Sequence, residues 1–331
     1  MKKKIIFILF ILVAVVSCSS NSDNEQSKIL RFAHPFPESH PVFDVYQNMA
    51  DLIGERTKNE YKIEVYGNAT LGEQRATMEL VQSGALDMAS VYAGNIETVQ
   101  PTYEIISTPY IFKDFEHYLK CLTSDVFRDK LYMASHNKGF VALTHMEAGA
   151  RSFYNRIKPI TKPSDLHGLK IRVTESPTPI EMATLLGASP VALPYGEVYT
   201  ALQQGLIDGA ENNPTALVSV RHGEVAKYYS LTEHSRVPDI LIISSKIWDS
   251  LSDENKRIFE STAREVSSNY NAIYDSAIQR ELEYAKNEMG VMVNEVNQVP
   301  FRELVLPLHK KLEEKSSELK ELVSFVKSLE N

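Results

Sequence analysis

Apolar positions recur along this chain with two different spacings, and the two spacings alternate. Short apolar runs are typical of buried strands, whereas the segments between them carry apolar residues every three or four positions, as on one face of a helix. Residues 61–66 alternate apolar and polar side chains, which predicts a strand with one exposed face. The predicted strands are 29–33, 62–66, 86–91, 140–144, 169–173, 207–210 and 240–244, and the predicted helices include 41–57, 73–83, 197–204 and 214–226. This order of elements predicts an α/β fold.

One short pattern occurs twice. In residues 81–89, and again in residues 202–210, a helical segment ends at a glycine and a short apolar run follows. Glycine commonly terminates helices because it adopts left-handed backbone angles without steric cost. In open α/β sheets, ligands bind beyond the carboxyl ends of the strands. Two such units facing each other would form two lobes around a shared cleft, although two helix–turn–strand units can also match by coincidence.

A single long helix is predicted near the C-terminus. Residues 253–289 contain neither Gly nor Pro, and their apolar residues recur at helical spacing. At a rise of about 1.5 Å per residue this helix would be about 55 Å long, which exceeds the diameter of about 30 Å of a small domain. We therefore expect it to bridge both lobes or to kink. A final helix over residues 301–329 is expected to be solvated on one face and packed on the other.

The first residues have the features of a secretory signal peptide. Three lysines precede the apolar run 5–16, which is shorter than the roughly 20 residues that a transmembrane helix needs. Residues 15–18, Val-Val-Ser-Cys, resemble a bacterial lipobox in which Cys18 is acylated after cleavage. The alternative is an ordinary secreted protein with a chance cysteine. Residues 1–17 are therefore predicted to be a signal peptide, and the polar residues 18–28 a lipidated cysteine and a flexible tether.

Charge and cysteine content restrict the possible partners. The formal net charge is −8, and loss of the lysine-rich leader would make the mature chain more acidic still. An acidic surface argues against nucleic acid or anionic lipid as a partner, so groups that bind an anion must lie locally in a cleft. If Cys18 is lipidated, Cys121 is left without a disulfide partner in the chain. Stability must then come from the hydrophobic core, and about 300 mature residues predict two domains.

The segment 149–214 concentrates side chains suited to binding a carboxylate. Arg151 and Arg172 lie near predicted strand ends, and Glu211 and Asn212 follow a glycine at another strand end. A guanidinium group offers two parallel donors to a carboxylate with little loss of rotamer freedom. No nucleophile with a neighbouring base occurs close by. This pattern predicts capture of an acid and not its conversion.

Each of these side chains also has a structural interpretation. Arg172 could instead connect loops within one lobe. Asn212 and Asn213 could form a turn before Pro214, since Asn favours turns; we expect Asn212 to contact ligand and Asn213 to form the turn or support the site. Glu211 would repel an anion unless it is protonated, bridged by water or turned towards a hydroxyl, so its role stays open.

The sequence offers little for metal or covalent chemistry. His34 and His40 lie in a proline-rich stretch, but no third metal ligand follows at a recognisable spacing. The chain has no HExxH motif, no GxSxG nucleophile elbow and no phosphate-binding glycine-rich loop. No metal or cofactor is therefore expected. His34 is expected to donate a hydrogen bond at the end of the first strand.

Several of these motifs follow one another in the order that is typical of one family. GARSFY (149–154), KPSDLHGLKIRV (162–173) and PYGEVYTALQQGLIDGAENNP (194–214) are followed by the predicted long helix. The chain thereby resembles the substrate-binding proteins of TRAP transporters, the DctP-like family, over nearly its whole mature length, and within that family it resembles the hexuronate-binding members. The resemblance implies a two-lobed periplasmic-binding-protein fold that closes over an organic anion and delivers it to a membrane permease.

The resemblance also implies roles for individual residues. Arg151 falls on the family's carboxylate-clamping arginine and Arg172 on its supporting arginine. Asn212 falls on a ligand-contacting asparagine, and Tyr195 on an aromatic ring that stacks on the ligand. The first-lobe positions that vary with the ligand fall on His34, Gln74, Arg75, Tyr92 and Asn95. That set is rich in partners for hydroxyl groups and contains an extra cation, which favours a polyhydroxylated monocarboxylate over a simple dicarboxylate.

The expected protein is a monomeric extracytoplasmic solute receptor of a TRAP-type transporter, anchored to the membrane as a lipoprotein. Its expected ligand is a sugar acid, a hexuronate such as glucuronate or galacturonate, with C4-dicarboxylates and sialic acid as alternatives. A periplasmic uronide-processing enzyme, with His34 or Glu211 as its base, and a ligand sensor are the rival functions. The expected lobes are 29–148 with about 238–276 for lobe I, and 149–237 with about 277–331 for lobe II.

Overall fold

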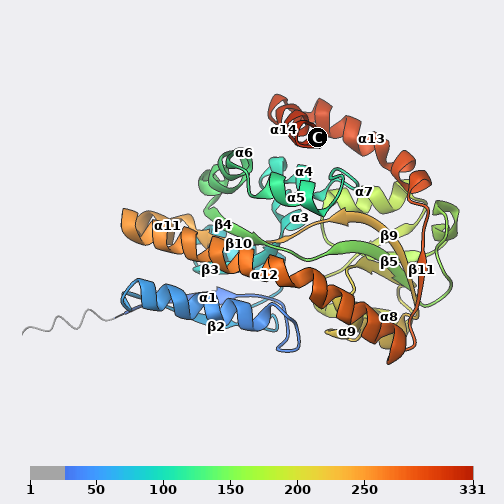
Figure 1. Cartoon of the computed structure of the whole chain (residues 1–331), viewed down its shortest axis with the longest axis horizontal. Coiled ribbons are helices and arrows are strands. Elements are labelled where there is room, and N and C mark those ends of the chain that lie inside the picture. The colour runs from blue at the N-terminus through green and yellow to red at the C-terminus, as the bar shows by residue number, and fades with distance from the viewer. Residues whose placement is uncertain (1–26, 331) are drawn as a thin grey trace, which may run out of the picture.

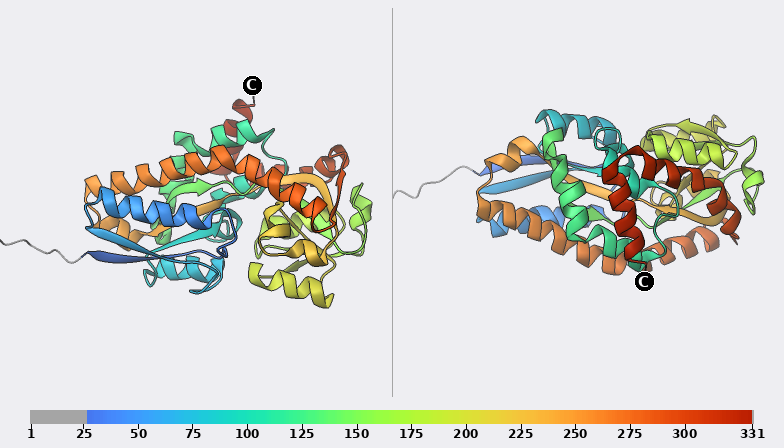
Figure 2. Two further views of the ribbon diagram at one scale, coloured as in Figure 1. Left: turned by 60° about the horizontal axis from the view of Figure 1, so that its bottom comes forward. Right: turned by 90° about the horizontal axis from the view of Figure 1, so that it is seen from above.

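The computed structural model describes residues 27–330, apart from the side chain of Asp275 (Figure 1). The predicted signal peptide, and all but the end of the predicted tether, lie outside these residues. Among the helices of residues 27–330, none is both long enough and apolar enough to cross a membrane. Two separate β-sheets each form the centre of a lobe, which confirms the predicted two-lobed α/β fold (Figures 1 and 2).

The first sheet forms lobe I, with the strand order β2-β1-β3-β10-β4. Its strands are β1 (Lys28–Ala33), β2 (Tyr61–Tyr66), β3 (Met88–Tyr92), β4 (Phe140–Met146) and β10 (Asp239–Ser244). β10 lies antiparallel between β3 and β4 and is buried along its whole length, so it forms a continuous apolar run and not an alternating one. The helices of this lobe are α1 (Phe43–Arg56), α2 (Gln74–Ser83), α3 (Ala93–Ile96), α4 (Glu104–Ser107), α5 (Phe115–Leu122), α6 (Asp125–Phe127) and α11 (Ser245–Ser250).

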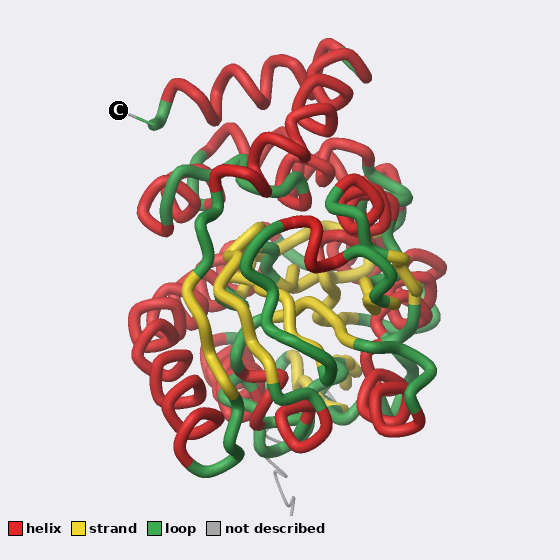
Figure 3. The backbone as a smooth tube through the Cα atoms, turned by 90° about the vertical axis from the view of Figure 1, so that its right-hand side faces the viewer, coloured by secondary structure: helices red, strands yellow, loops and turns green. Residues whose placement is uncertain are grey.

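The second sheet forms lobe II, with the strand order β11-β9-β5-β8-β6-β7. Its strands are β5 (Ala150–Asn155), β6 (Lys170–Val173), β7 (Ser189–Ala192), β8 (Gly209–Asn212), β9 (Tyr228–Arg236) and β11 (Met292–Glu295). Its helices are α7 (Pro177–Leu185), α8 (Val198–Gln204), α9 (Thr215–Val218) and α10 (His222–Val225). Helices enclose the strands, as the view along the molecule shows (Figure 3).

Two short crossovers connect the sheets. The first, residues 147–149, leads from β4 to β5, and the second, residues 237–238, leads from β9 back to β10. The two are tied together through Glu147, which accepts a hydrogen bond of 2.7 Å from the Gly149 backbone N–H and lies 3.4 Å from Arg236 Nη1. The crossovers therefore lie side by side at the junction of the lobes.

The long helix α12 (Asp253–Asn287) crosses this junction, as predicted. It contacts α1 and β4 in lobe I and α9 in lobe II, and it runs along both lobes in Figure 1. Ser252 begins it, because the Ser252 side chain accepts a hydrogen bond from the Asn255 backbone N–H.

The predicted C-terminal helix is two helices, α13 (Val299–Lys315) and α14 (Ser317–Ser328). They are separated at Ser316, whose backbone is extended and whose side chain caps α14. Phe301 and Val305 of α13 pack into lobe II, whereas Leu322 and Val326 of α14 pack into the core of lobe I. The expected assignment of the whole C-terminal segment to lobe II is thus wrong for α14.

The repeated pattern of the sequence has the expected local structure in both lobes. α2 and α8 each end at a glycine with left-handed backbone angles, Gly84 with φ 73° and Gly205 with φ 72°. The predicted helix 214–226 is interrupted instead. Arg221 adopts a φ of 64° there, so the segment forms the two short helices α9 and α10.

Candidate functional site

The candidate site is a cleft between the two lobes. Its walls are built from the ends of strands of both sheets, including Tyr92 of β3, Arg151 of β5, Arg172 of β6, Asn212 of β8 and Asp239 of β10. Ligands of open α/β sheets bind at such strand ends. The cleft thus lies where the repeated helix–turn–strand units predict it.

Arg151 is buried in the wall of lobe II and is almost saturated with hydrogen bonds. Its Nε donates to Glu211 Oε2 over 2.6 Å, and its Nη2 donates over 2.8 Å to both Glu211 Oε1 and the Glu211 carbonyl. Its Nη1 donates to Asn212 Oδ1 over 2.9 Å. Since a guanidinium group has five N–H donors, only one of those on Arg151 is left for a ligand.

Glu211 is the counter-ion of Arg151 and does not line the cleft. Burial by itself would raise the pKa of Glu211. The charge of Arg151, together with hydrogen bonds from His234 and Arg151, outweighs burial and lowers that pKa to about 2. Glu211 is therefore ionised and lies outside the cleft lining, where it pairs with Arg151.

Arg172 is also buried but is paired differently. Its Nε and Nη2 both donate to the Leu193 carbonyl, over 2.9 and 2.7 Å. No carboxylate within residues 27–330 forms an ion pair with it, and burial lowers its pKa. The hydrogens on Nη1 are thus available to a ligand. Arg172 therefore contributes to the cleft lining a buried positive charge that no carboxylate of the described residues pairs with.

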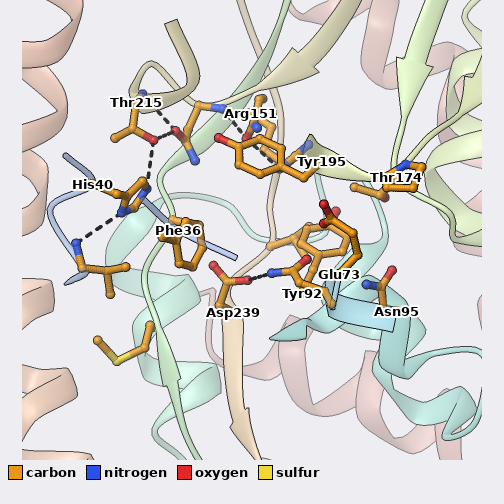
Figure 4. A pocket seen from close by; sticks show the side chains of 18 of the residues that line it. Phe36, His40, Glu73, Tyr92, Asn95, Arg151, Thr174, Tyr195, Thr215 and Asp239 are labelled. Atoms are coloured by element: carbon orange, nitrogen blue, oxygen red, sulfur yellow. Dashed lines mark hydrogen bonds between the residues drawn. The ribbon is translucent and has the colours of Figure 1, made fainter. Parts of the chain in front are cut away.

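Aromatic rings form much of the remaining lining. Tyr195 lines the cleft from lobe II, and Tyr92 lines it from lobe I. Phe36 also lines the cleft and lies between His40 and Asp239 in Figure 4. The guanidinium carbon of Arg151 lies 5.2 Å from the centre of the Tyr92 ring. Rings of this kind suit the apolar face of a sugar or another flat ligand.

Lobe I contributes the other polar groups. Gln74, Arg75, Tyr92 and Asn95 all line the cleft, as expected from the sequence. The Gln74 amide donates a 2.9 Å hydrogen bond to Asp239 Oδ1, whereas Arg75 is half exposed and lies 3.3 Å from Glu79. Lobe I therefore brings several polar side chains to the cleft. Its cation among these four residues, Arg75, is shared with Glu79.

His34 is the one predicted ligand residue of lobe I that the structure does not bring to the cleft. Its ring lies among the aromatic rings of Phe32, Phe36, Phe43 and Tyr46. Neither of its ring nitrogens has a hydrogen-bond partner in the described part of the chain, so the expected donation at the strand end is also wrong. The His34 ring instead packs against the ring of Phe36, which lines the cleft.

His40 lines the cleft in place of His34. The Val42 backbone N–H donates to His40 Nδ1 over 3.2 Å, and His40 Nε2 reaches Thr215 Oγ1 of lobe II over 3.5 Å (Figure 4). Thr215 in turn donates to Asn213 Oδ1. Asn213 thus forms the predicted turn before Pro214, and it also supports a contact between the lobes.

Further contacts join the lobes around the cleft. Glu97, which follows α3 of lobe I, accepts hydrogen bonds from Ser176 Oγ over 2.6 Å and from the Thr178 backbone N–H and Oγ1 over 2.9 Å each. Glu73 lies so close to Gly196 that a Cβ there would be 2.5 Å from Glu73 Oε1. The structure therefore has its lobes in contact over the cleft.

Sequence reasoning missed several residues of this lining. They are Phe36, His40, Glu73, Glu147, Thr174, Glu175, Thr215, Asp239, Tyr270 and Tyr274. Glu73 directly precedes Gln74 and Arg75, which were predicted to line the cleft, so its position next to them could have identified it. Asp239 starts an apolar strand and Tyr270 belongs to a long helix, and neither position is marked by a local pattern.

A buried arginine that has no carboxylate partner within residues 27–330, set among hydroxyl-binding groups and rings, fits a binding protein for a small organic anion. Comparison with known proteins agrees with this class. Residues 32–316 match the family model of the bacterial extracellular solute-binding proteins, family 7, called DctP. The chain belongs to this family of extracytoplasmic solute receptors.

Individual relatives are similar over most of their length. The 2,3-diketo-L-gulonate-binding periplasmic protein YiaO of Escherichia coli is 32% identical, over 88% of this chain and 87% of its own. A TRAP periplasmic solute-binding protein of Anaerococcus prevotii, solved with bound glucuronate, is 34% identical with a TM-score of 0.88, over 92% of this chain and 98% of its own. One of Xanthobacter autotrophicus, solved with bound galacturonate, is 34% identical with a TM-score of 0.86, over 90% and 99%.

Proposed function

We propose that this receptor binds a hexuronate, glucuronate or galacturonate, for a TRAP-type transporter. The observation that carries the proposal is Arg172, a buried arginine of the cleft with no carboxylate partner in residues 27–330. A bound carboxylate would supply its missing counter-ion. The uronate ligands of the Anaerococcus and Xanthobacter proteins support the same ligand class.

The proposal exchanges the roles that the sequence predicts for the two arginines. Arg151 was expected to clamp the ligand carboxylate, but Glu211 already neutralises it and occupies most of its donors. We propose that Arg172 forms the main ion pair and that Arg151 supports it with its remaining donor. Asn212 uses its Oδ1 for Arg151, so its Nδ2 is the atom left to donate to the ligand.

Capture proceeds by closure of the lobes about the two crossovers, residues 147–149 and 237–238. Lobe I comprises residues 29–148 with 238 to about 276, and lobe II residues 149–237. An open cleft admits the anion, and closure then removes water from the pair between Arg172 and the carboxylate. Removal of water strengthens that pair because the attraction between charges rises as the local dielectric falls. Tyr195 covers the apolar face of the ring.

The geometry favours capture over catalysis. The two bases that the sequence offered to a uronide-processing enzyme are His34 and Glu211. His34 lies outside the cleft, and Glu211 is held by Arg151 and turned away from it. The proposed protein is therefore a receptor without enzymatic activity.

The proposed partners follow from the receptor function. The closed, loaded receptor would release the hexuronate to the membrane permease of a TRAP transporter, and it would do so as a monomer. We also propose that Cys18, which lies outside the described residues, anchors the chain to the membrane by a lipid.

Titration calorimetry tests the ligand class directly. Glucuronate and galacturonate are expected to bind tightly, whereas glucose, which lacks the carboxylate, is expected to bind at least a hundredfold more weakly because Arg172 stays unpaired. Succinate and sialic acid serve as the competing acids. Tight binding of either of these, without heat from both uronates, would overturn the hexuronate assignment. Mass spectrometry of ligand carried through purification provides an independent check.

A further inference from the structure

Asp239 occupies the wall of the cleft that faces the arginines. It is the first residue of β10, directly after the second crossover, and it lies in register with Tyr92 of β3 and Met146 of β4. Arg151 and Arg172 belong to lobe II, whereas Asp239 belongs to the sheet of lobe I. In Figure 4, Arg151 and Asp239 lie on opposite sides of the space between Phe36, Tyr92 and Tyr195. A ligand that pairs with the arginines must therefore present its other end to Asp239.

The Asp239 carboxyl group is oriented but not satisfied by the protein. The Gln74 amide donates to Oδ1 over 2.9 Å, and this is the only hydrogen bond that the side chain makes within residues 27–330. No ion pair to it exists there either, and the residue is only 8% exposed. A buried carboxyl group with a free oxygen is costly unless a donor reaches it. Burial raises the pKa of Asp239 to about 7, which the Gln74 hydrogen bond and the Arg151 charge oppose.

We propose that Asp239, oriented by Gln74, determines ligand specificity by accepting hydrogen bonds from the ring hydroxyls remote from the ligand carboxylate. This inference rests on the proposed hexuronate function. In a pyranuronate the carboxylate is attached to C5, and C2 and C3 lie on the far side of the ring. When the arginines hold the carboxylate, the C2 and C3 hydroxyls therefore face Asp239. A carboxylate accepts from such a pair of neighbouring hydroxyls with both of its oxygens.

The other acidic groups of the cleft are less suited to this role. Glu73 is held against the backbone of Gly196, and Glu147 accepts from Gly149 at the crossover. Glu211 is committed to Arg151. Glu175 also lines the cleft, but it follows β6 and therefore lies in the same lobe as the arginines. Glu147 Oε2 has no hydrogen-bond partner within residues 27–330 either, but that atom is fully buried. Among these acidic groups, Asp239 combines a position opposite the arginines with an oxygen that faces the cleft and that no donor within residues 27–330 reaches.

A specific pattern of selectivity follows. Glucuronate and galacturonate differ only at C4, a position that Asp239 does not read, so the receptor accepts both. A change at C2, as in mannuronate, or removal of the C2 or C3 hydroxyl deprives the Asp239 carboxyl of one of its two ligand donors. Such ligands bind roughly tenfold to a hundredfold more weakly, since hydrogen bonds to charged groups have effects of this size.

The test combines receptor variants with deoxy ligands in titration calorimetry. Wild type, Asp239→Ala and Asp239→Asn are titrated with glucuronate and with its 2-deoxy, 3-deoxy and 4-deoxy analogues. Asp51→Ala, which alters an exposed aspartate of α1, is the matched control. Asp239→Asn retains the shape of the side chain, and thermal melting checks that each variant is folded.

We expect the effect of Asp239→Ala on affinity and the effect of removing the C2 or C3 hydroxyl of the sugar ring not to add. Asp239→Ala lowers glucuronate affinity about tenfold to a hundredfold, and removal of the C2 or C3 hydroxyl then costs little more. The loss of the C4 hydroxyl remains additive with Asp239→Ala. If folded Asp239→Ala and Asp239→Asn bind glucuronate as tightly as wild type, or if all three deoxy ligands are additive with them, the inference is wrong. Absence of hexuronate binding by wild type would instead refute the proposed function itself.

Discussion

Arg151 and Glu211 form a buried ion pair in which Nε lies 2.6 Å from Oε2, and both side chains are at most 5% exposed. The two residues are far apart in sequence but come together on the neighbouring antiparallel strands β5 and β8. Because the pair is neutral as a unit, the positive charge that faces the cleft is that of Arg172. This relationship separates the roles of two arginines that look equivalent in sequence.

Truncation of Arg172 should abolish tight binding while the protein stays folded. Arg172→Ala is expected to weaken hexuronate binding by about 3–5 kcal/mol, or roughly two to four orders of magnitude, because the ligand carboxylate would be buried without a counter-charge. Arg280→Ala, on the exposed face of α12, is the control. Calorimetry decides the matter: an Arg172→Ala variant with wild-type affinity would contradict the proposed ion pair.

Removal of Arg151 should affect stability as well as binding. Arg151→Ala leaves the Glu211 carboxyl buried without its counter-ion, so the free energy of unfolding is expected to fall by about 3–5 kcal/mol. The double variant Arg151→Ala with Glu211→Gln should recover part of this loss, since no buried charge is then left unpaired. Urea unfolding measures both effects. Equal stability of the single and double variants would show that the pair is not the source of the loss.

Acid should weaken the fold through Glu211. The pKa of Glu211 is about 2 in the folded chain, below its ordinary value of 4.5, so the unfolded chain binds the proton more readily as the pH falls. The stabilisation is complete above about pH 4.5 and is lost progressively between pH 4.5 and 2. Glu211→Gln should flatten this part of the stability profile. Parallel profiles for wild type and Glu211→Gln between pH 5 and 3 would refute the prediction.

Hexuronate affinity should rise with pH through about 7. The pKa of Asp239 is about 7, and hydroxyl groups donate more strongly to an ionised carboxylate than to a neutral one, so binding favours the deprotonated form. The ligand carboxylate is ionised over this whole range. The other titratable groups coupled to Asp239 are Arg151, which stays charged, and Tyr46, Tyr195, Tyr270 and Tyr274, which burial keeps neutral.

Calorimetry between pH 5.5 and 8.5 measures this dependence. Asp239→Asn cannot ionise and should show a flat profile, whereas wild type titrated with 2-deoxyglucuronate, which retains the C3 hydroxyl, should show a shallower rise than with glucuronate. An affinity that falls as the pH rises, or a slope unchanged in Asp239→Asn, would contradict the assignment.

Glu97 should stabilise the closed arrangement of the lobes. It accepts three hydrogen bonds from Ser176 and Thr178 across the lobes. Saturating hexuronate is therefore expected to reduce the radius of gyration of wild type in small-angle scattering. Glu97→Ala should need more ligand for the same compaction, unlike the exposed control Glu116→Ala. Identical radii of wild type with and without saturating ligand would mean that the lobes do not close.

Cys18 should tether the chain to a membrane. The variant Cys18→Ala is expected to accumulate as an uncleaved precursor or to appear in the soluble fraction, because a lipoprotein precursor is processed at its acylated cysteine. Fractionation and gel migration compare it with wild type. Behaviour identical to wild type would rule out the lipid anchor.

Much of the architecture was predictable because it is encoded over short distances. The uninterrupted helical spacing of 253–289 predicted α12 to within two residues of its end. The glycines at 84 and 205 marked the ends of α2 and α8, since few other residues adopt left-handed backbone angles at low cost. The motifs around Arg151 and Arg172 placed two arginines near strand ends of lobe II. Such signals depend on each residue and its immediate neighbours.

β5 and β9, the strands of lobe II next to the crossovers, were missed for the same reason, whereas β4 and β10 were predicted. β5 is almost wholly buried although Arg151, Ser152 and Asn155 are polar, so it lacks the apolar run that marks a buried strand. Its polar groups find partners on β8, in the turn before Lys158 and on Glu233, none of which is identifiable from local spacing. Hydrophobic patterning cannot detect a strand whose burial is made favourable by hydrogen bonds.

The chemistry of the site was decided by tertiary structure. The sequence by itself determined that Arg151 and Arg172 were available, along with polar groups in the other lobe. Only the fold determined that Glu211 neutralises Arg151, that His34 lies behind Phe36, and that Asp239 faces the arginines. The reason is physical: the charge that a side chain presents to a ligand depends on which partners reach it, and these partners are brought close by strand pairing and lobe packing across long stretches of chain.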